Sequence, residues 1–235
     1  MTQGLPDTAQ EQLKRTFKRF LIAVVFSIAF GYIEAAVVVY LRAIFYPNGF
    51  TFPLAEFGIG PLWERLLLTE VGREAATLVL ILTASYLFGQ NHRRRFAYFL
   101  TIFAVWDIFY YVWLKVLLDW PATIMDWDIL FLIPAPWASP VLAPILVSIT
   151  LLVFAAIILY RSDHARPVKV ALADWLAFIL AAVVVVVSFC IAGRHITKPD
   201  YQSHFYWPLF AAGLLAAVAL FVKSLLKSSN MAKQV

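Results

Sequence analysis

The segment FAYFLTIFAVWDIFYYVWLKVL, residues 96–117, decides the fold class of this chain. Apart from Asp107 and Lys115, its side chains are all uncharged, and most of them are apolar. A helix needs about 20 largely apolar residues to cross the hydrocarbon core of a bilayer, and this segment is long enough. It therefore predicts a transmembrane helix that carries one acid near its middle.

The composition of the whole chain agrees with this prediction. Hydrophobic residues make up 63% of the 235 residues and charged residues only 14%, and the mean hydropathy is +0.81. A soluble domain is only about half apolar, so we predict an integral membrane protein. The apolar runs are continuous and do not alternate with polar residues, which favours helices over a β-barrel. The single cysteine, Cys190, excludes a paired-thiol mechanism within one chain.

Six apolar runs predict six transmembrane helices, at about residues 20–40, 70–88, 96–117, 140–160, 171–192 and 208–222. We therefore expect an all-α fold, a polytopic integral membrane helical bundle that forms a single domain over residues 20–222. A basic N-terminal segment, residues 1–19, precedes this domain, and a short tail, residues 223–235, follows it.

Basic residues mark one side of the predicted bundle. Short loops rich in Lys and Arg stay on the cytoplasmic side of a membrane. Most of these residues precede the first span, follow the sixth, or separate the second from the third and the fourth from the fifth: Lys14, Arg15, Lys18, Arg19, Arg93, Arg94, Arg95, Arg161, Arg166, Lys169, Lys223, Lys227 and Lys233. We therefore place both termini in the cytoplasm and the bundle in the plasma (inner) membrane. The net charge of +5 then reflects orientation and contact with the lipid bilayer, and we expect no nucleic-acid partner.

Two long outer connections are expected to cover the outer end of the bundle. The sequence PLWERLLL, residues 61–68, predicts a short amphipathic helix on the membrane surface. Prolines at positions 134, 136, 140 and 144 predict a Pro-broken or re-entrant segment near residues 128–144, after a short apolar helix capped by Asp126 or Asp128. Non-helical backbone at membrane depth must face protein or water, which predicts a cavity near the outer leaflet.

Ionisable residues inside the predicted spans point to a functional pocket. A charge at the middle of a bilayer costs about 2.5 to 3.5 kcal/mol, and the short side chain of Asp107 cannot reach the surface, whereas Lys115 can. Glu34 poses the same problem in the outer half of the first span. Residues three or four positions apart share a helix face, so Tyr110 and Tyr111 lie on the same face as Asp107. On the second span, Glu70 and Glu74 share a face, and an arginine lies beside them. The candidate pocket residues are Glu34, Glu70, Arg73, Glu74, Asp107, Tyr110, Tyr111, His195 and His204.

These residue types leave three classes of function open. The first is binding or translocation of a small cation or an amphiphilic molecule, alone or with a membrane-protein partner in a larger complex. The second is an intramembrane enzyme that acts on a lipid-like substrate at the outer leaflet, with one buried carboxyl as general acid or base. The third is a structural or assembly subunit, in which Glu34 pairs with Arg42 or Arg73 and Asp107 bonds to a tyrosine.

Several chemistries have no support in the sequence. The chain contains no Glu-x-x-His, no His-x-x-x-His and no cysteine cluster, so we predict no metal site. A Walker lysine loop and a dinucleotide-binding glycine pattern are also absent, which excludes a self-powered ATPase. Catalytic residues and cofactors therefore remain unassigned from the sequence.

Overall fold

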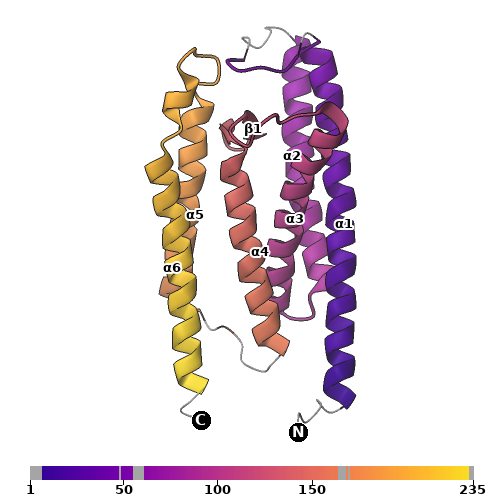
Figure 1. Cartoon of the computed structure of the whole chain (residues 1–235), viewed down its shortest axis with the longest axis vertical. Helices are drawn as coiled ribbons and strands as arrows, with labels where there is room; N and C mark the ends of the chain where they lie inside the picture. The colour runs from indigo at the N-terminus through magenta and orange to yellow at the C-terminus, as the bar shows by residue number, and fades with distance from the viewer. Residues whose placement is uncertain (1–6, 48, 55–60, 164–167, 169, 233–235) are drawn as a thin grey trace.

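In the computed structural model, the described residues 7–47, 49–54, 61–163, 168 and 170–232 form long helices and one small hairpin (Figure 1). Arg166, Lys169 and Lys233, used above to predict orientation, lie outside these residues. The elements are α1 (Asp7–Phe45), α2 (Pro61–Phe88), α3 (His92–Leu118), β1 (Trp127–Phe131), β2 (Trp137–Pro140), α4 (Leu142–Asp163), α5 (Leu172–Gly193), the 3-10 helix η1 (Tyr201–His204) and α6 (Trp207–Ala232).

Five of the helices are long and apolar enough to cross a membrane, namely α1, α3, α4, α5 and α6. The protein is therefore a multi-pass helical bundle suited to a membrane, as predicted. The helix α2 has 28 residues and runs alongside the others, but it is not one of the five. The half of α2 farther from the chain termini carries Glu64, Arg65, Glu70, Arg73 and Glu74. This end of the bundle is called outer below, and the end with the termini inner, after the orientation predicted from the sequence. Both termini lie at the same end of the bundle (Figure 1).

The helices extend beyond the apolar runs that predicted them. The first helix already begins at Asp7 and the last ends at Ala232, so both continue through the basic terminal segments. The expected surface helix PLWERLLL is not separate, because residues 61–68 form the first turns of α2. A proline at the first helical position lacks only an N–H that would have no intrahelical acceptor, so Pro61 starts the helix without breaking it.

The central helix is α3, which packs against α1, α2 and α4. Its close contact with α1 depends on Gly31, where a Cβ would lie 3.0 Å from the carbonyl oxygen of Trp106 and 3.2 Å from the amide nitrogen of Tyr110. Buried apolar side chains fill the inner half of the bundle, among them Ile81, Tyr98 and others: Ala23, Ala97, Ile102, Phe154 and Phe221. This core fills the space between the helices in the inner half of the bundle. The close contact at Gly31 also places the next turn of α1, which carries Glu34, beside the outer half of α3.

The segment after α3 is a β-hairpin, which the sequence analysis did not predict. The strands are antiparallel, with Asp128 opposite Ser139 and Phe131 opposite Trp137. The prediction of a short helix after Asp126 is wrong, because residues 127–131 form β1. The backbone between β1 and Leu142, where α4 begins, is also non-helical, as the prolines of this segment predicted.

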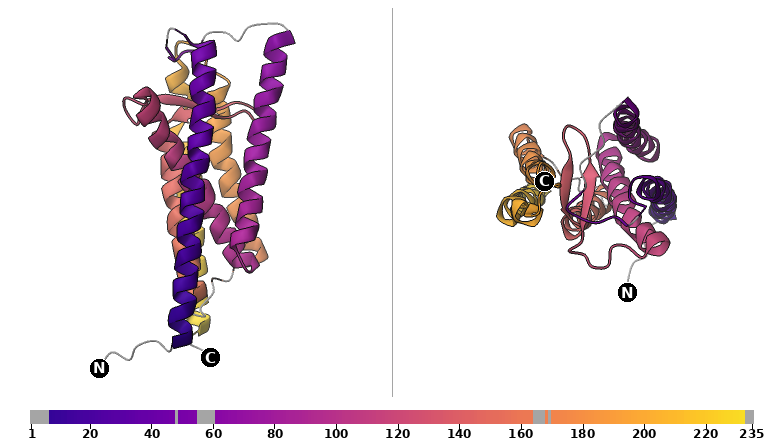
Figure 2. Two further views of the ribbon diagram at one scale, coloured as in Figure 1. Left: turned by 90° about the vertical axis from the view of Figure 1, so that its right-hand side faces the viewer. Right: turned by 90° about the horizontal axis from the view of Figure 1, so that it is seen from above.

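The hairpin joins two helical groups. Seen from above, its strands lie between the pair α5 and α6 and the helices α1 to α3 (Figure 2). It packs against α5 and α4, and Trp127 and Ala138 share a buried outer core with residues of α5, η1–α6 and the loops: Leu54, Phe189, Ala192, Ile196, Phe205 and Phe210. The hairpin therefore separates α5 and α6 from the helices α1 to α3.

Candidate functional site

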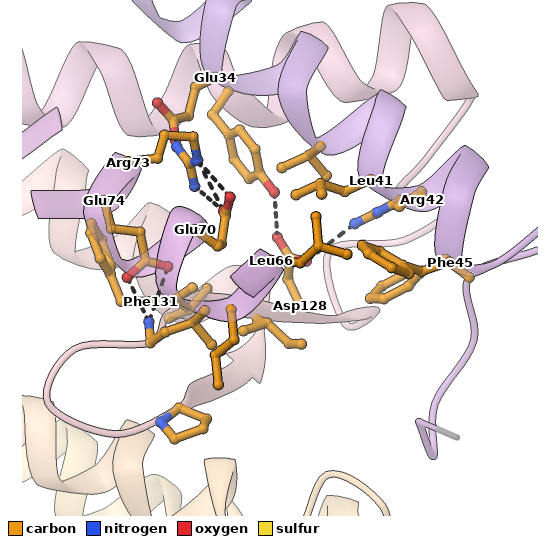
Figure 3. A pocket seen from close by; sticks show the side chains of 18 of the residues that line it. Glu34, Leu41, Arg42, Phe45, Leu66, Glu70, Arg73, Glu74, Asp128 and Phe131 are labelled. Atoms are coloured by element: carbon orange, nitrogen blue, oxygen red, sulfur yellow. Dashed lines mark hydrogen bonds and ion pairs between the residues drawn. The ribbon is translucent and has the colours of Figure 1, made fainter. Parts of the chain in front are cut away.

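A cavity of about 580 Å³ lies in the outer half of the protein, between α1, α2, α3 and the hairpin (Figure 3). Its size is within the range of pockets that hold one small organic molecule. Each of the three helices and the hairpin contributes at least one carboxyl group to its lining: Glu34 from α1, Glu64, Glu70 and Glu74 from α2, Asp107 from α3 and Asp128 from β1. The fold therefore contains a polar pocket at the end of the bundle away from the termini, and its place in the outer leaflet stays a prediction.

One arginine joins two of these acids. The Nε of Arg73 donates to both carboxylate oxygens of Glu70 at 2.9 Å, and its guanidinium also forms an ion pair with Glu34 of α1. Thr77 Oγ1 donates a further hydrogen bond to Glu34 at 3.2 Å. The side chains of Glu34 and Arg73 are only 9% and 23% exposed, so this is a largely buried cluster that links α2 to α1.

Two other acids receive hydrogen bonds only from neutral donors among the described contacts. Both carboxylate oxygens of Glu74 accept from the backbone N–H of Leu132, at 2.8 and 3.1 Å, which ties α2 to the end of the hairpin. Asp107 accepts from Ser148 Oγ of α4 at 2.7 Å. These two carboxyl groups line the cavity and form no ion pair with any described residue, so they are well placed to meet a cationic ligand.

A second cluster surrounds Asp128. Arg42 Nη2 donates to one of its oxygens at 3.1 Å, and the hydroxyl of Tyr110 donates to the other at 3.1 Å. The guanidinium of Arg42 lies between two aromatic rings, 4.0 Å from the centroid of Phe50 and 3.8 Å from that of Trp120. Burial raises the pKa of the Asp128 carboxyl, and the charge of Arg42 acts in the opposite direction. The pair is 8% and 2% exposed, so each charge depends on the other for compensation.

The structure brings the predicted pocket residues to the cavity, with the exception of the two histidines. Glu34, Glu70, Arg73, Glu74, Asp107, Tyr110 and Tyr111 all line it. His195 and His204 do not. Their rings stack on each other with centroids 3.7 Å apart in the connection between α5 and α6. There His204 contacts Asp200 at 3.2 Å, and His195 Nδ1 lies 2.9 Å from the carbonyl oxygen of Ile191.

Three important lining residues were not among the predicted ones. Arg42 was considered only as a partner of Glu34, and its actual partner, Asp128, is 86 positions away in the sequence. Glu34 pairs with Arg73, which the sequence analysis did include as an alternative. Asp107 bonds to Ser148 and not to a tyrosine. Glu64 was treated as part of a surface helix. A local sequence pattern cannot identify a pair such as Arg42 and Asp128, because the hairpin and α1 come together only in the folded chain.

The cavity has more carboxyl groups than cationic groups. Among its described lining residues are six carboxyl groups and two guanidinium groups, those of Arg42 and Arg73, and both arginines already contact acids. The rest of the wall is mostly apolar and aromatic, including Leu41, Phe45, Leu66, Leu67, Trp106 and Phe131. No three His, Cys, Asp or Glu side chains within the described parts of the chain lie in an arrangement that holds a metal ion.

No protein family model, curated protein or solved structure matches this chain.

Proposed function

We propose that this protein binds an amphiphilic organic cation, a molecule with an ammonium group and an apolar body, in the outer cavity. The observation that carries the proposal is the excess of carboxyl over guanidinium groups in a mostly apolar pocket. Unpaired charge in such a site is costly, so the excess carboxyl groups must bind protons or a cation. An ammonium group supplies both the charge and the hydrogen-bond donors that the carboxylates accept.

Glu74 and Asp107 are two lining acids without an ion pair among the described residues, so each is a candidate acceptor for the ammonium group. Each of these carboxyl groups has a neutral donor, which fixes its orientation but leaves acceptor capacity for a ligand. Aromatic side chains of α3, including Trp106 and Tyr111, line the same cavity. Their rings favour a nearby cation through its attraction to the ring face, by about 0.5 to 2 kcal/mol each.

The packed inner half of the bundle favours ligand binding over translocation of the ligand through the protein. The buried core around Ile81, Tyr98 and Phe154 fills the space between the helices on the side where the termini lie. In the proposed arrangement six helices cross the inner membrane, both termini are cytoplasmic, and the cavity belongs to the outer leaflet. The ligand therefore binds on the outer side, and the protein presents or recognises it there.

The test is calorimetric binding to the purified protein in lipid nanodiscs. Octylamine and octyltrimethylammonium are the probes, and octanoate and octanol are the chain-matched controls. We expect octylamine to bind saturably and octyltrimethylammonium to bind more weakly, because it has the charge but no N–H donor. Octanoate should not bind, because it adds a negative charge to a pocket rich in acids. Equal binding of all four compounds would show that the pocket recognises only the alkyl chain and would reject the proposal.

Two isosteric variants identify the acids that bind the ammonium. Glu74→Gln and Asp107→Asn keep the acceptors for Leu132 N–H and Ser148 Oγ but remove the charge. A hydrogen bond to a charged group contributes about 1.5 to 3 kcal/mol, so we expect affinity losses of about tenfold to a hundredfold. The control is Asp200→Asn, which changes an exposed outer acid that does not line the cavity. Unchanged affinity in both pocket variants would contradict the assignment.

A further inference from the structure

The direction in which the cavity opens identifies the source of its ligand. We infer that the cavity opens sideways into the outer leaflet between α1 and α2, and that its ligand is a single-chain amine dissolved in the membrane. This inference rests on the proposed function and adds where the amine comes from. Four features of the described residues carry it: a closed outer end, an exposed edge on α2, a divergence of α1 from α2, and the size of the cavity.

Packed aromatic side chains cover the outer end of the cavity. The ring of Phe50 lies 5.5 Å from that of Phe52 and 6.0 Å from that of Trp120, and Phe52 lies 5.3 Å from Tyr201. The guanidinium of Arg42 is held between Phe50 and Trp120. The loop that carries these phenylalanines is tied down where the N–H of Leu54 donates to the carbonyl of Ile196 at 2.8 Å. Access from the water along the bundle axis therefore passes through a packed layer.

On the side of α2, by contrast, the lining of the cavity reaches the molecular surface. Leu67 lines the cavity and is 55% exposed, and Glu64, one turn before it, also lines the cavity and is exposed. The neighbouring Leu68 is 70% exposed but does not line the cavity. An exposed leucine edge on a membrane helix is suited to contact with lipid chains, so the cavity meets the bilayer here.

The two helices are joined at depth and separate toward their outer ends. Glu34 of α1 contacts Arg73 and Thr77 of α2. Beyond this point the outer ends of α1 and α2 diverge (Figure 2, left). Facing residues of the diverging parts, Leu41 and Phe45 on α1 and Leu66 and Leu67 on α2, all line the cavity. The ionic cluster thus forms the floor of an opening with apolar sides.

The shape and charge of this opening fit one alkyl chain with an ammonium head. In the proposed arrangement the head lies at Glu74 or Asp107, and the chain lies along the leucines toward the lipid. A cavity of about 580 Å³ accommodates a single drug-sized molecule, which excludes most of a two-chain phospholipid. An amine that reaches the cavity from the leaflet keeps its chain in an apolar environment throughout.

The rate of ligand association tests this path. The probe is octylamine with a dansyl group at the far end of its chain, added to the full-length protein in nanodiscs and followed by stopped-flow fluorescence. Leu67→Trp narrows the opening, and Leu68→Trp is the matched control on the lipid-facing side. We expect Leu67→Trp to slow association on the order of tenfold and Leu68→Trp to leave it unchanged. Equal rates in the two variants, with equilibrium binding retained, would overturn the lateral path and leave the proposed function intact.

A second measurement does not depend on binding. In a Cys190→Ala background, a bimane label on Leu67→Cys reports the surroundings of the opening. We expect quenching by a nitroxide phospholipid in the outer leaflet and little quenching by iodide in the outer solution. Quenching by iodide alone would place the opening in water and overturn the inference. If wild-type protein binds no amine at all, the proposed function itself fails, whatever the quenching shows.

Discussion

At the scale of single residues, the site depends on how two arginines compensate six acids. Arg73 contacts Glu34 and Glu70, and Arg42 contacts Asp128, so each guanidinium already has an acid as its partner. Among the described residues, neither arginine forms an ion pair with Glu74 or Asp107. The apolar surroundings make each remaining carboxyl group expensive to ionise without a partner, and this cost is what a cationic ligand relieves.

Removing Arg73 is predicted to destabilise the protein strongly. Arg73→Gln leaves Glu34 and Glu70 without their cation in a largely buried cluster, and loss of one partner of such a pair costs about 3 to 5 kcal/mol. Thermal unfolding in detergent measures the effect as a fall in the midpoint temperature. The double variant Arg73→Gln with Glu34→Gln should recover part of the loss, because it removes one of the uncompensated charges.

The control for this experiment is an exposed ion pair in the same protein. Lys115 contacts Asp119 at 2.7 Å, but their side chains are 50% and 92% exposed. Lys115→Gln should therefore leave the unfolding temperature nearly unchanged, since water screens such pairs. A similar fall for Lys115→Gln and Arg73→Gln would show that the cluster at Arg73 has no special structural role.

At the scale of elements, the position of α1 on α3 decides where Glu34 lies. The contact is close because Gly31 has no side chain, and the turn after it carries Glu34 into the cavity. The hairpin acts in the same way on the other side, since β1 places Asp128 beside Arg42 and the turn that follows β1 places the Leu132 N–H beside Glu74. The site is therefore assembled by the packing of α1, α2, α3 and β1 and not by one of them alone.

A bulky residue at Gly31 is predicted to separate α1 from α3. Gly31→Val places methyl groups against the backbone of Trp106 and Tyr110, and overpacking of this kind costs about 1 to 3 kcal/mol. We expect a lower unfolding temperature together with weaker amine binding, because Glu34 moves with α1. Gly72→Ala is the matched glycine control. Nothing lies within 4 Å of a Cβ at Gly72, so this change should be neutral or stabilise α2 by up to about 1 kcal/mol.

At the scale of the whole molecule, the sequence predicts the bundle well and the site in part. The long apolar runs identify the spanning helices, because the length of a membrane helix is set by the bilayer. The positions of Glu34, Arg73 and Asp107 along these runs predicted similar levels in the membrane, and all three line the same cavity. The hairpin and the Arg42–Asp128 pair were missed, because they depend on contacts between segments far apart in the chain. His195 and His204 share the outer level of the cavity in the sequence argument, yet the fold stacks them on each other.

The number of membrane crossings is the remaining prediction at this scale, and it depends on α2. Its charged outer half sets it apart from the five clearly apolar helices. In the fold it runs alongside α3, and Glu70, Arg73 and Glu74 line the cavity, while Glu64 and Arg65 near its start are exposed. A helix whose charges inside the membrane face protein and not lipid can cross the bilayer. We therefore expect α2 to cross as well, which gives six crossings in total. Single cysteines at exposed positions on either side of α2, Thr51→Cys and Arg93→Cys in a Cys190→Ala background, test this directly. A membrane-impermeant maleimide added to intact cells should label position 51 at once and position 93 only after permeabilisation. Labelling of both positions from outside, or of neither, would mean that α2 does not cross, and the cavity would then lose its membrane-facing side.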